Sequence, residues 1–177
     1  MTREQLEHAI RAACDVAGDT EVWVFGSQSI LGQHPDAPAA LRFSEEVDID
    51  PVHRPEMTDA IDGALGEGST FHRTHGFYVH GVSIEAAILP EGWEGRTRVV
   101  KNANTNGCSG RCLEAHDLAA SILAAWRDKD REFVRLLLRE KLIRANRLVR
   151  LIHLLPRSEE QRTLYRTWVD GTARELT

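Results

Sequence analysis

The sequence predicts an α+β fold, with a mixed sheet core flanked by helices in the first half and a helical part at the C-terminus. Short apolar runs rich in β-branched and aromatic residues, bounded by glycine and polar residues, occur before residue 110 and are typical of strands. Apolar residues at helical spacing dominate after residue 113. This order favours segregated strands and helices, so we divide the chain into a core, residues 1–112, and a helical part, residues 113–177.

The first elements follow from local signals. Thr2 and Gln5 form a capping-box pattern, and apolar residues at helical spacing continue it, so we expect a helix over Thr2–Ala17. The run from Glu21 to Phe25 predicts a buried strand, which ends at Gly26-Ser27. A short helix, a breaker-rich loop and a second strand follow: Gln28–Leu31, 32–45 and Val47–Val52.

The remaining elements are predicted in the same way. The expected helix Glu56–Leu65 ends at two nearby glycines, and three strands follow it: Phe77–His80, Val82–Leu89 and Arg96–Asn102. A polar loop over 102–110 separates these strands from the helical part. Its expected helices are Glu114–Trp126, Asp130–Arg139, Ala145–Leu155 and a last one capped by Ser158, which extends to about Glu175.

The composition is that of one globular domain. The chain has 177 residues, of which 42% are hydrophobic and 28% charged. The N-terminus lacks the apolar stretch of a signal peptide and no run is long enough to span a membrane, so we expect a cytoplasmic protein with no membrane partner. Three cysteines predict no disulfide framework. The net charge of −5 argues against general affinity for nucleic acid.

Two segments carry the expected chemistry. Asp48 and Asp50 lie two residues apart on one strand, so their carboxylates share a face about 6–7 Å apart and can bind a hard cation such as Mg²⁺. Gly26-Ser27 leads from a strand into a helix, where backbone N–H groups can hold a phosphate. A phosphate cradle beside metal-binding carboxylates is typical of phosphoryl or nucleotidyl transfer.

The chain resembles a known group at these positions. Gly26-Ser27 and Asp48-Ile49-Asp50 are similar to the signature of the DNA-polymerase-β-like nucleotidyltransferase superfamily. The later runs Ala115–Ser121 and Arg127–Val134 resemble the second half of the AbiEii/MenT-like toxin nucleotidyltransferases. The resemblance covers roughly residues 20–140 and implies a nucleotidyltransferase fold whose helical part completes the active-site cleft.

The resemblance also implies residue roles. Asp48 and Asp50 would hold Mg²⁺ or Mn²⁺, with Glu85 on a neighbouring strand as the third carboxylate. Gly26, Ser27 and Ser29 would hold the triphosphate, and Lys129 and Asp130 would complete the catalytic set. At position 122, where the resembling proteins commonly carry a lysine, this chain has Ile122.

The expected function is transfer of a nucleoside monophosphate from an NTP to RNA, foremost the 3′ end of a tRNA, by the toxin of a bacterial toxin–antitoxin system with a cognate antitoxin protein. Two alternatives remain. One is a protein-adenylylating antitoxin of the same fold. The other is a nucleotide- or RNA-binding module in which catalysis has lapsed, as Ile122 indicates.

Three other patterns need an interpretation. From Arg127 to Arg150, nine basic residues against four acidic ones give a local charge of about +5, which predicts either a solvated helix face or an RNA-contacting surface. Cys108, Cys112 and His116 lack the usual spacing of a zinc site and a fourth ligand. His72, His75 and His80 are interpreted as turn and strand residues rather than metal ligands.

Overall fold

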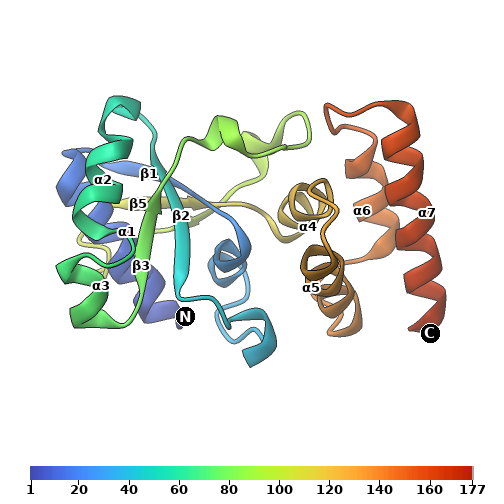
Figure 1. Cartoon of the computed structure of the whole chain (residues 1–177), viewed down its shortest axis with the longest axis horizontal. Coiled ribbons are helices and arrows are strands. Elements are labelled where there is room, and N and C mark those ends of the chain that lie inside the picture. The colour runs from blue at the N-terminus through green and yellow to red at the C-terminus, as the bar shows by residue number, and fades with distance from the viewer. Residues whose placement is uncertain (177) are drawn as a thin grey trace.

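The computed structural model describes residues 1–176 and has an α+β architecture, as the sequence predicts (Figure 1). The strands are β1 (Glu21–Phe25), β2 (Glu46–Pro51), β3 (Tyr78–Gly81), β4 (Arg98–Val100) and β5 (Ser109–Cys112). The α-helices are α1 (Arg3–Ala17), α2 (Thr58–Leu65), α3 (Thr70–His75), α4 (Ala115–Leu123), α5 (Asp128–Arg139), α6 (Ala145–Ile152) and α7 (Glu159–Glu175). Short 3₁₀ helices span Ser27–Gly32, Ala39–Leu41, Pro55–Met57, Ile84–Ala86 and Trp93–Arg96.

The five strands form one mixed sheet in the order β3-β2-β1-β5-β4. β1 is antiparallel to β2 and parallel to β5, whereas β2 and β3 are parallel. In this register Phe25 pairs with Asp48, and Asp48 pairs with His80. The C-terminal end of β1 therefore lies beside the first residues of β2, and His80 of β3 lies next to Asp48 of β2, at the same end of the strands.

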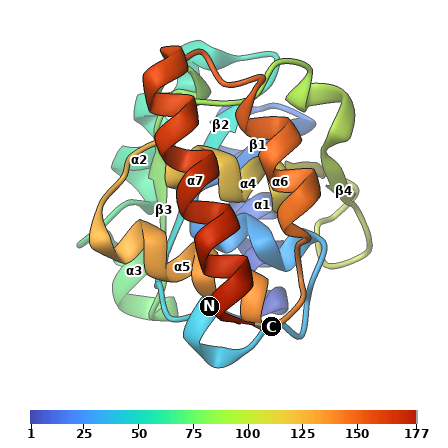
Figure 2. The ribbon, with the colours of Figure 1, turned by 90° about the vertical axis from the view of Figure 1, so that its right-hand side faces the viewer.

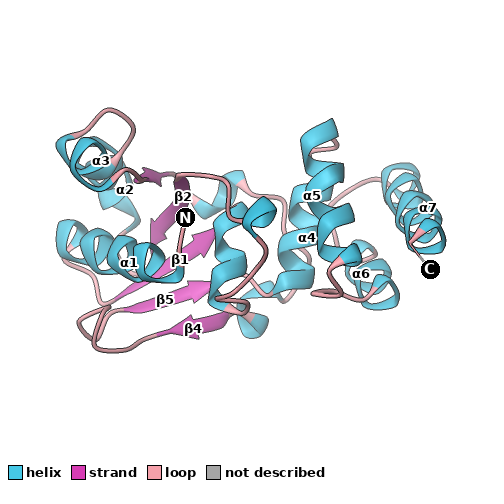
Figure 3. Ribbon diagram, turned by 90° about the horizontal axis from the view of Figure 1, so that it is seen from below, coloured by secondary structure: helices cyan, strands magenta, loops and turns pink. Residues whose placement is uncertain are grey.

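The helices lie on two sides of the strands. α1, α2 and α3 pack against one face of the sheet, whereas α4 to α7 lie on the other side of the molecule (Figure 1), beyond the ends of β1 and β5 (Figure 3). A side chain at Gly110 would collide with Ile10 of α1, so Gly110 and its partner Val22 face α1. Side chains alternate along a strand, so Trp23 and its partner Asp50 lie on the opposite face, where the Trp23 ring contacts Trp93 with ring centroids 4.8 Å apart.

The C-terminal helices form a second layer. α6 and α7 lie outermost, with α4 between them and the sheet (Figure 2). A buried polar network joins this layer to the core. The Arg96 guanidinium donates to both carboxylate oxygens of Asp117, at 2.7 and 2.8 Å, and Asp117 is fully buried. A bidentate pair of this kind fixes orientation as well as distance, so α4 is held firmly against the 3₁₀ helix that contains Arg96.

Most predicted elements are confirmed, and α1 shows why. Thr2 and Gln5 form the capping box, and Gly18 ends the helix in a left-handed conformation with φ of 61°. The predicted strand Val82–Leu89 is wrong: this segment contains the 3₁₀ helix Ile84–Ala86, with Ser83 accepting from the Glu85 N–H. β5 and α3 were not expected. No helix of residues 1–176 is both long and apolar enough to cross a membrane.

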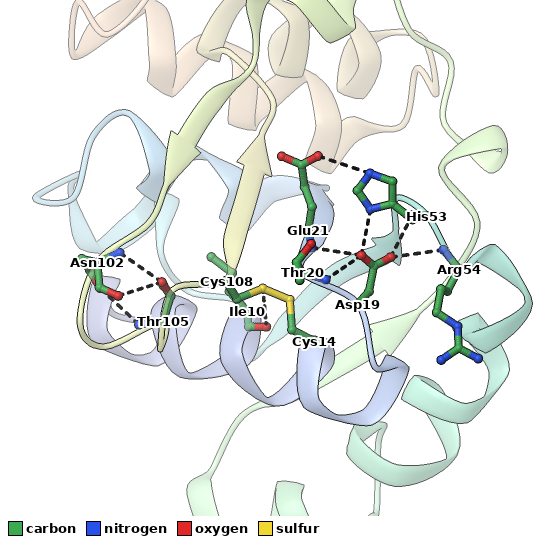
Figure 4. The surroundings of a disulfide bond; sticks show 10 residues. All are labelled: Ile10, Cys14, Asp19, Thr20, Glu21, His53, Arg54, Asn102, Thr105 and Cys108. Atoms are coloured by element: carbon green, nitrogen blue, oxygen red, sulfur yellow. Dashed lines mark hydrogen bonds and ion pairs between the residues drawn. A yellow bond between two sulfur atoms is a disulfide. The ribbon is translucent and has the colours of Figure 1, made fainter.

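The cysteine pattern also needs correction. Cys14 of α1 is joined by a disulfide to Cys108, just before β5, with a Cα–Cα distance of 6.6 Å (Figure 4). Cys112 is free and buried. Asp19 lies near the same end of α1 and caps two segments, because it accepts from the N–H groups of Thr20 and His53 at 2.6 and 2.8 Å. The disulfide and the hydrogen bond between His53 and Asp19 therefore connect the C-terminal end of α1 to segments that are distant in sequence.

Candidate active site

A pocket of about 750 Å³ lies between this end of the strands and the C-terminal helices. Its lining comes from the turn after β1, from the loop before β2 and the first half of β2, from residues of the α2–α3 connection, α3 and β3, and from the end of α4 and the start of α5. It includes Gly26, Ser27, Gln28, Phe43, Glu46, Asp48, Ile122, Arg127, Lys129, Asp130 and Phe133. This size suits a small-molecule ligand. The two sequence motifs, far apart in the chain, therefore share one pocket.

Gly26 brings the turn directly onto Asp48. Its φ is 64°, which favours glycine, and a Cβ at this position would lie 2.0 Å from Asp48 Oδ2. A side chain here would displace the Asp48 carboxylate. Ser27 follows, and its hydroxyl accepts a hydrogen bond of 3.2 Å from Gln28 Nε2.

Asp48 forms a compact cluster with Glu46 and His80. Asp48 Oδ1 lies 2.9 Å and Glu46 Oε1 lies 3.8 Å from His80 Nδ1. One ligand atom from each residue falls within 4.8 Å of the others, so this cluster could hold a metal ion. The Tyr78 hydroxyl donates to Glu46 Oε2 at 2.6 Å, which orients the Glu46 carboxylate.

The environment of Asp48 is unfavourable for its charge. Burial raises the pKa of its carboxyl to about 6, the neighbouring Glu46 charge adds to the rise, and the hydrogen bond to His80 opposes it. A nearby cation would relieve both effects, because it stabilises the ionised form of both carboxylates. The electrostatics of the cluster therefore favour a bound cation.

Asp50 has a different environment from Asp48. It is buried, and its two oxygens accept from the Thr58 hydroxyl at 2.6 Å and from the Ile84 N–H at 2.9 Å. It does not line the pocket. Both carboxylates face the same side of β2, as expected, but Asp50 is engaged in anchoring the segments that follow β2 and β3. Its metal role stays a prediction that these bonds disfavour.

Two further predicted residues lie away from the pocket. Glu85 is exposed on the 3₁₀ helix Ile84–Ala86 and belongs neither to the pocket lining nor to the metal-type cluster. Its orientation was predicted from strand alternation, which does not apply to this segment. Ser29 is fully buried beneath the turn and also outside the pocket lining, so the expected triphosphate contact is not supported.

The opposite wall of the pocket comes from the start of α5. Asp130 is nearly buried and pairs with Arg127 at 2.7 Å, whereas Lys129 is exposed. Ile122 of α4 lies in the same wall, where the resembling proteins would place a lysine. Lys129 is thus the cation of this wall that has no acidic partner among the described residues.

The basic segment from Arg127 to Arg150 is largely neutralised by its own neighbourhood. Five of its nine cations are in ion pairs: Arg127 with Asp130, Arg131 with Asp128, Arg135 with Glu175, Arg139 with Glu140 and Arg147 with Glu114. This pattern favours the solvated-face interpretation for much of the segment. An RNA-contacting role is left to the cations outside these pairs, Lys129, Lys141, Arg144 and Arg150.

Cys108, Cys112 and His116 have separate surroundings in the structure. Cys108 is in the disulfide and Cys112 is buried, where burial raises the pKa of its thiol to about 12. His116 has another role. Its Nδ1 lies 2.9 Å from the buried Glu114, and its Nε2 accepts from the Arg144 N–H at 2.9 Å, which links α4 to α6.

The three histidines of residues 72–80 have separate surroundings. His72 lies against Tyr78 and His75 against Phe71, whereas His80 belongs to the Glu46–Asp48 cluster. The interpretation of His80 as an ordinary strand residue therefore missed the part of the cluster that β3 contributes. Knowing that β3 pairs with β2 in parallel, with His80 opposite Asp48, would have been sufficient to find it.

Comparison of the chain with protein-family models, curated proteins and solved structures gives no match. The class of site is therefore argued from its geometry. That geometry combines a pocket of ligand size, a glycine turn and a cation-type cluster of two carboxylates and one imidazole.

Proposed function

We propose that this protein is a metal-dependent nucleotidyltransferase that moves a nucleoside monophosphate from an NTP to an acceptor, foremost RNA. The observation that carries the proposal is the shared pocket. Gly26-Ser27, Asp48 and the Arg127–Asp130 segment were each singled out for nucleotidyl transfer from the sequence, and all of them line it. Its volume of about 750 Å³ is adequate for a nucleoside triphosphate.

In this proposal each wall has its own task. The Glu46–Asp48–His80 cluster would hold the cation, Mg²⁺ or Mn²⁺, which neutralises charge on the triphosphate and lowers the pKa of the attacking hydroxyl. Gly26-Ser27 would lie along the phosphates. Lys129, exposed on the opposite wall, would contact phosphate or the acceptor strand.

The direct test is transfer of label from each of the four α-labelled NTPs to total RNA, and separately to a pool of cell proteins. The proposal predicts labelled RNA with the wild-type chain and none with Asp48→Asn. Asp15→Asn, which changes an exposed aspartate of α1, is the matched control and should transfer normally. Label in protein alone would favour an adenylylating antitoxin.

The toxin role follows from the resemblance and has its own test. Induced expression in a bacterial host should arrest growth with the wild-type chain and not with Asp48→Asn at equal protein level. Equal arrest by both variants would show that toxicity does not depend on the pocket.

One observation favours a second candidate, a nucleotide-binding module without turnover. Ile122 places an aliphatic side chain in the wall where a lysine is expected. Calorimetry showing NTP binding that Asp48→Asn weakens, together with no release of pyrophosphate in the presence of RNA or protein, would support this candidate over the transferase.

A further inference from the structure

We infer that the metal site of this pocket is formed by Glu46, Asp48 and His80, and that it prefers a first-row transition ion, Mn²⁺ or Zn²⁺, over Mg²⁺. The inference rests on the proposed function only for the biological role of the ion. It departs from the Asp48–Asp50 pair, and it introduces a nitrogen ligand.

The distances within the cluster fit one ion. Ligand atoms held about 2.1 Å from a metal are about 3.0 Å apart when they subtend 90° and about 4.2 Å apart when they are opposite. The separations of His80 Nδ1 from Asp48 Oδ1 and from Glu46 Oε1, 2.9 and 3.8 Å, lie at and between these limits. The three side chains can therefore meet around an ion with small rotations.

Asp50 is fixed by the hydrogen bonds that it already makes. The Thr58 hydroxyl donates to one oxygen in a buried setting, the Ile84 N–H donates to the other in a partly buried one, and the side chain is itself buried. Each oxygen keeps a second acceptor site, but Asp50 does not line the pocket, so to reach an ion there it would have to rotate and break at least one of these bonds, which costs roughly 1–3 kcal/mol. Glu46 and His80 are partly exposed and already lie beside Asp48.

A second observation points to a ligand in the same pocket. Gln28 lines it and is 1% exposed, yet its Oε1 has no hydrogen-bond partner among the described residues. Its Nε2 is engaged by Ser27 Oγ and by the Leu41 carbonyl, both at 3.2 Å. Buried acceptors in native proteins are usually satisfied, so a water or ligand hydroxyl held at this wall of the pocket is expected to donate to Gln28 Oε1.

The imidazole sets the preference. Mg²⁺ takes hard oxygen ligands and keeps much of its water, whereas imidazole suits transition ions such as Zn²⁺; carboxylates suit Mn²⁺ as well. Two carboxylates and one imidazole therefore fit Mn²⁺ or Zn²⁺ better than Mg²⁺. Replacing His80 by aspartate would make all three ligands carboxylates and should shift the preference towards Mg²⁺.

The test measures Mn²⁺ binding by electron paramagnetic resonance without nucleotide, with Mg²⁺ as competitor. We expect wild-type protein to bind Mn²⁺, with Mg²⁺ displacing it only at more than 100-fold excess. His80→Asp should bind Mn²⁺ but lose it at a Mg²⁺ excess at least 10-fold lower. Asp48→Asn should reduce Mn²⁺ affinity at least 10-fold, and Asp50→Asn should change it less than threefold.

The results separate the inference from the proposed function. Equal Mg²⁺ competition in wild type and His80→Asp would overturn the preference, and loss of Mn²⁺ binding in Asp50→Asn, checked as folded by circular dichroism, would overturn the ligand set. Mn²⁺ binding with the expected variant pattern but no NTP transfer would leave the inference standing and the proposed function refuted.

Discussion

Asp48 and His80 face each other across the parallel pair of β2 and β3, with Asp48 Oδ1 2.9 Å from His80 Nδ1. This pairing places an imidazole beside Asp48 and Glu46, the two carboxylates of the cluster that line the pocket. Because burial raises the pKa of Asp48 to about 6, ionisation of the cluster is unfavourable when no cation is bound. This unfavourable ionisation of Asp48 leads to the first prediction.

Asp48→Asn is expected to stabilise the metal-free protein at pH 8. The folded-state pKa of Asp48 is raised above its ordinary value of 3.8, so its ionised form opposes folding above about pH 6, and this penalty shrinks as the pH falls towards 4. We expect a gain in unfolding free energy on the order of 1–3 kcal/mol at pH 8 in a chelator. Urea denaturation measures it, with Asp15→Asn as control; a gain that is unchanged at pH 4 would contradict the burial argument.

Asp50→Ala is expected to destabilise the fold. The substitution leaves the buried Thr58 hydroxyl with one acceptor fewer and removes the Asp50 acceptor of the partly buried Ile84 N–H, so we expect a loss of about 2–4 kcal/mol in unfolding free energy. Equilibrium denaturation in urea checks this. Asp15→Ala should change stability by less than about 0.5 kcal/mol. Similar values for the two variants would show that Asp50 does not anchor the core.

Ile122→Lys is expected to raise the rate of NMP transfer. The new ammonium group would enter the pocket wall opposite Asp48, where it can contact nucleotide phosphates. We expect at least a 10-fold increase in single-turnover rate. Ile122→Met is the control, because it has similar length and no charge. An equal increase in the methionine variant would assign the effect to pocket shape rather than to charge.

Phe43→Ala is expected to weaken nucleotide binding. Phe43 is 89% exposed although it lines the pocket, which is unusual for a large apolar side chain and suits stacking on a nucleobase. Loss of such a stack costs about 1–3 kcal/mol, so the dissociation constant for the NTP should rise roughly 5- to 150-fold. Calorimetry measures it, and Phe43→Trp should retain the affinity. An unchanged constant in Phe43→Ala would place the base elsewhere.

The disulfide gives a prediction that needs no ligand. In denaturant without reductant, the protein should show one reactive thiol, that of Cys112, and three after reduction. Cys112→Ala should show none before reduction. Cys14→Ser with Cys108→Ser should lower the midpoint of thermal unfolding, because the bond closes a loop of 94 residues' separation, worth at most about 4–5 kcal/mol by chain entropy. Three thiols before reduction would contradict the pairing.

Much of the fold could be predicted because its elements carry strong local signals. The capping boxes of α1 and α7 and the apolar run of β1 were sufficient by themselves. β5 was missed because Ser109–Cys112 has no apolar alternation, and its place between β1 and β4 involves the close approach of Gly110 to Ile10. α3 carried signals that went unused, namely the Ser69 cap and the closing Gly76.

The candidate site was predictable where a local pattern marks a residue. The Gly26 turn and the strand carboxylate Asp48 could be identified in this way, and Glu46, two residues before Asp48 on the same strand, follows from the same alternation but was not used. His80 could not, because its place beside Asp48 depends on the register between β2 and β3, which no short-range pattern encodes. Asp50 had the right spacing, but its engagement with Thr58 and Ile84 comes from tertiary packing.

The close approach of Gly26 to Asp48 has a consequence for mutational studies. A methyl group at position 26 would collide with Asp48 Oδ2. The effects of substitutions at the two positions on stability are therefore expected to be coupled, although Gly26 follows β1 and Asp48 lies within β2. In a double-mutant cycle, Gly26→Ala combined with Asp48→Gly should therefore cost less than the sum of the single changes, because the clash is removed while the backbone strain at a φ of 64° remains. Changes at the glycine turn and at the acidic strand therefore have to be interpreted together rather than as changes to two separate motifs.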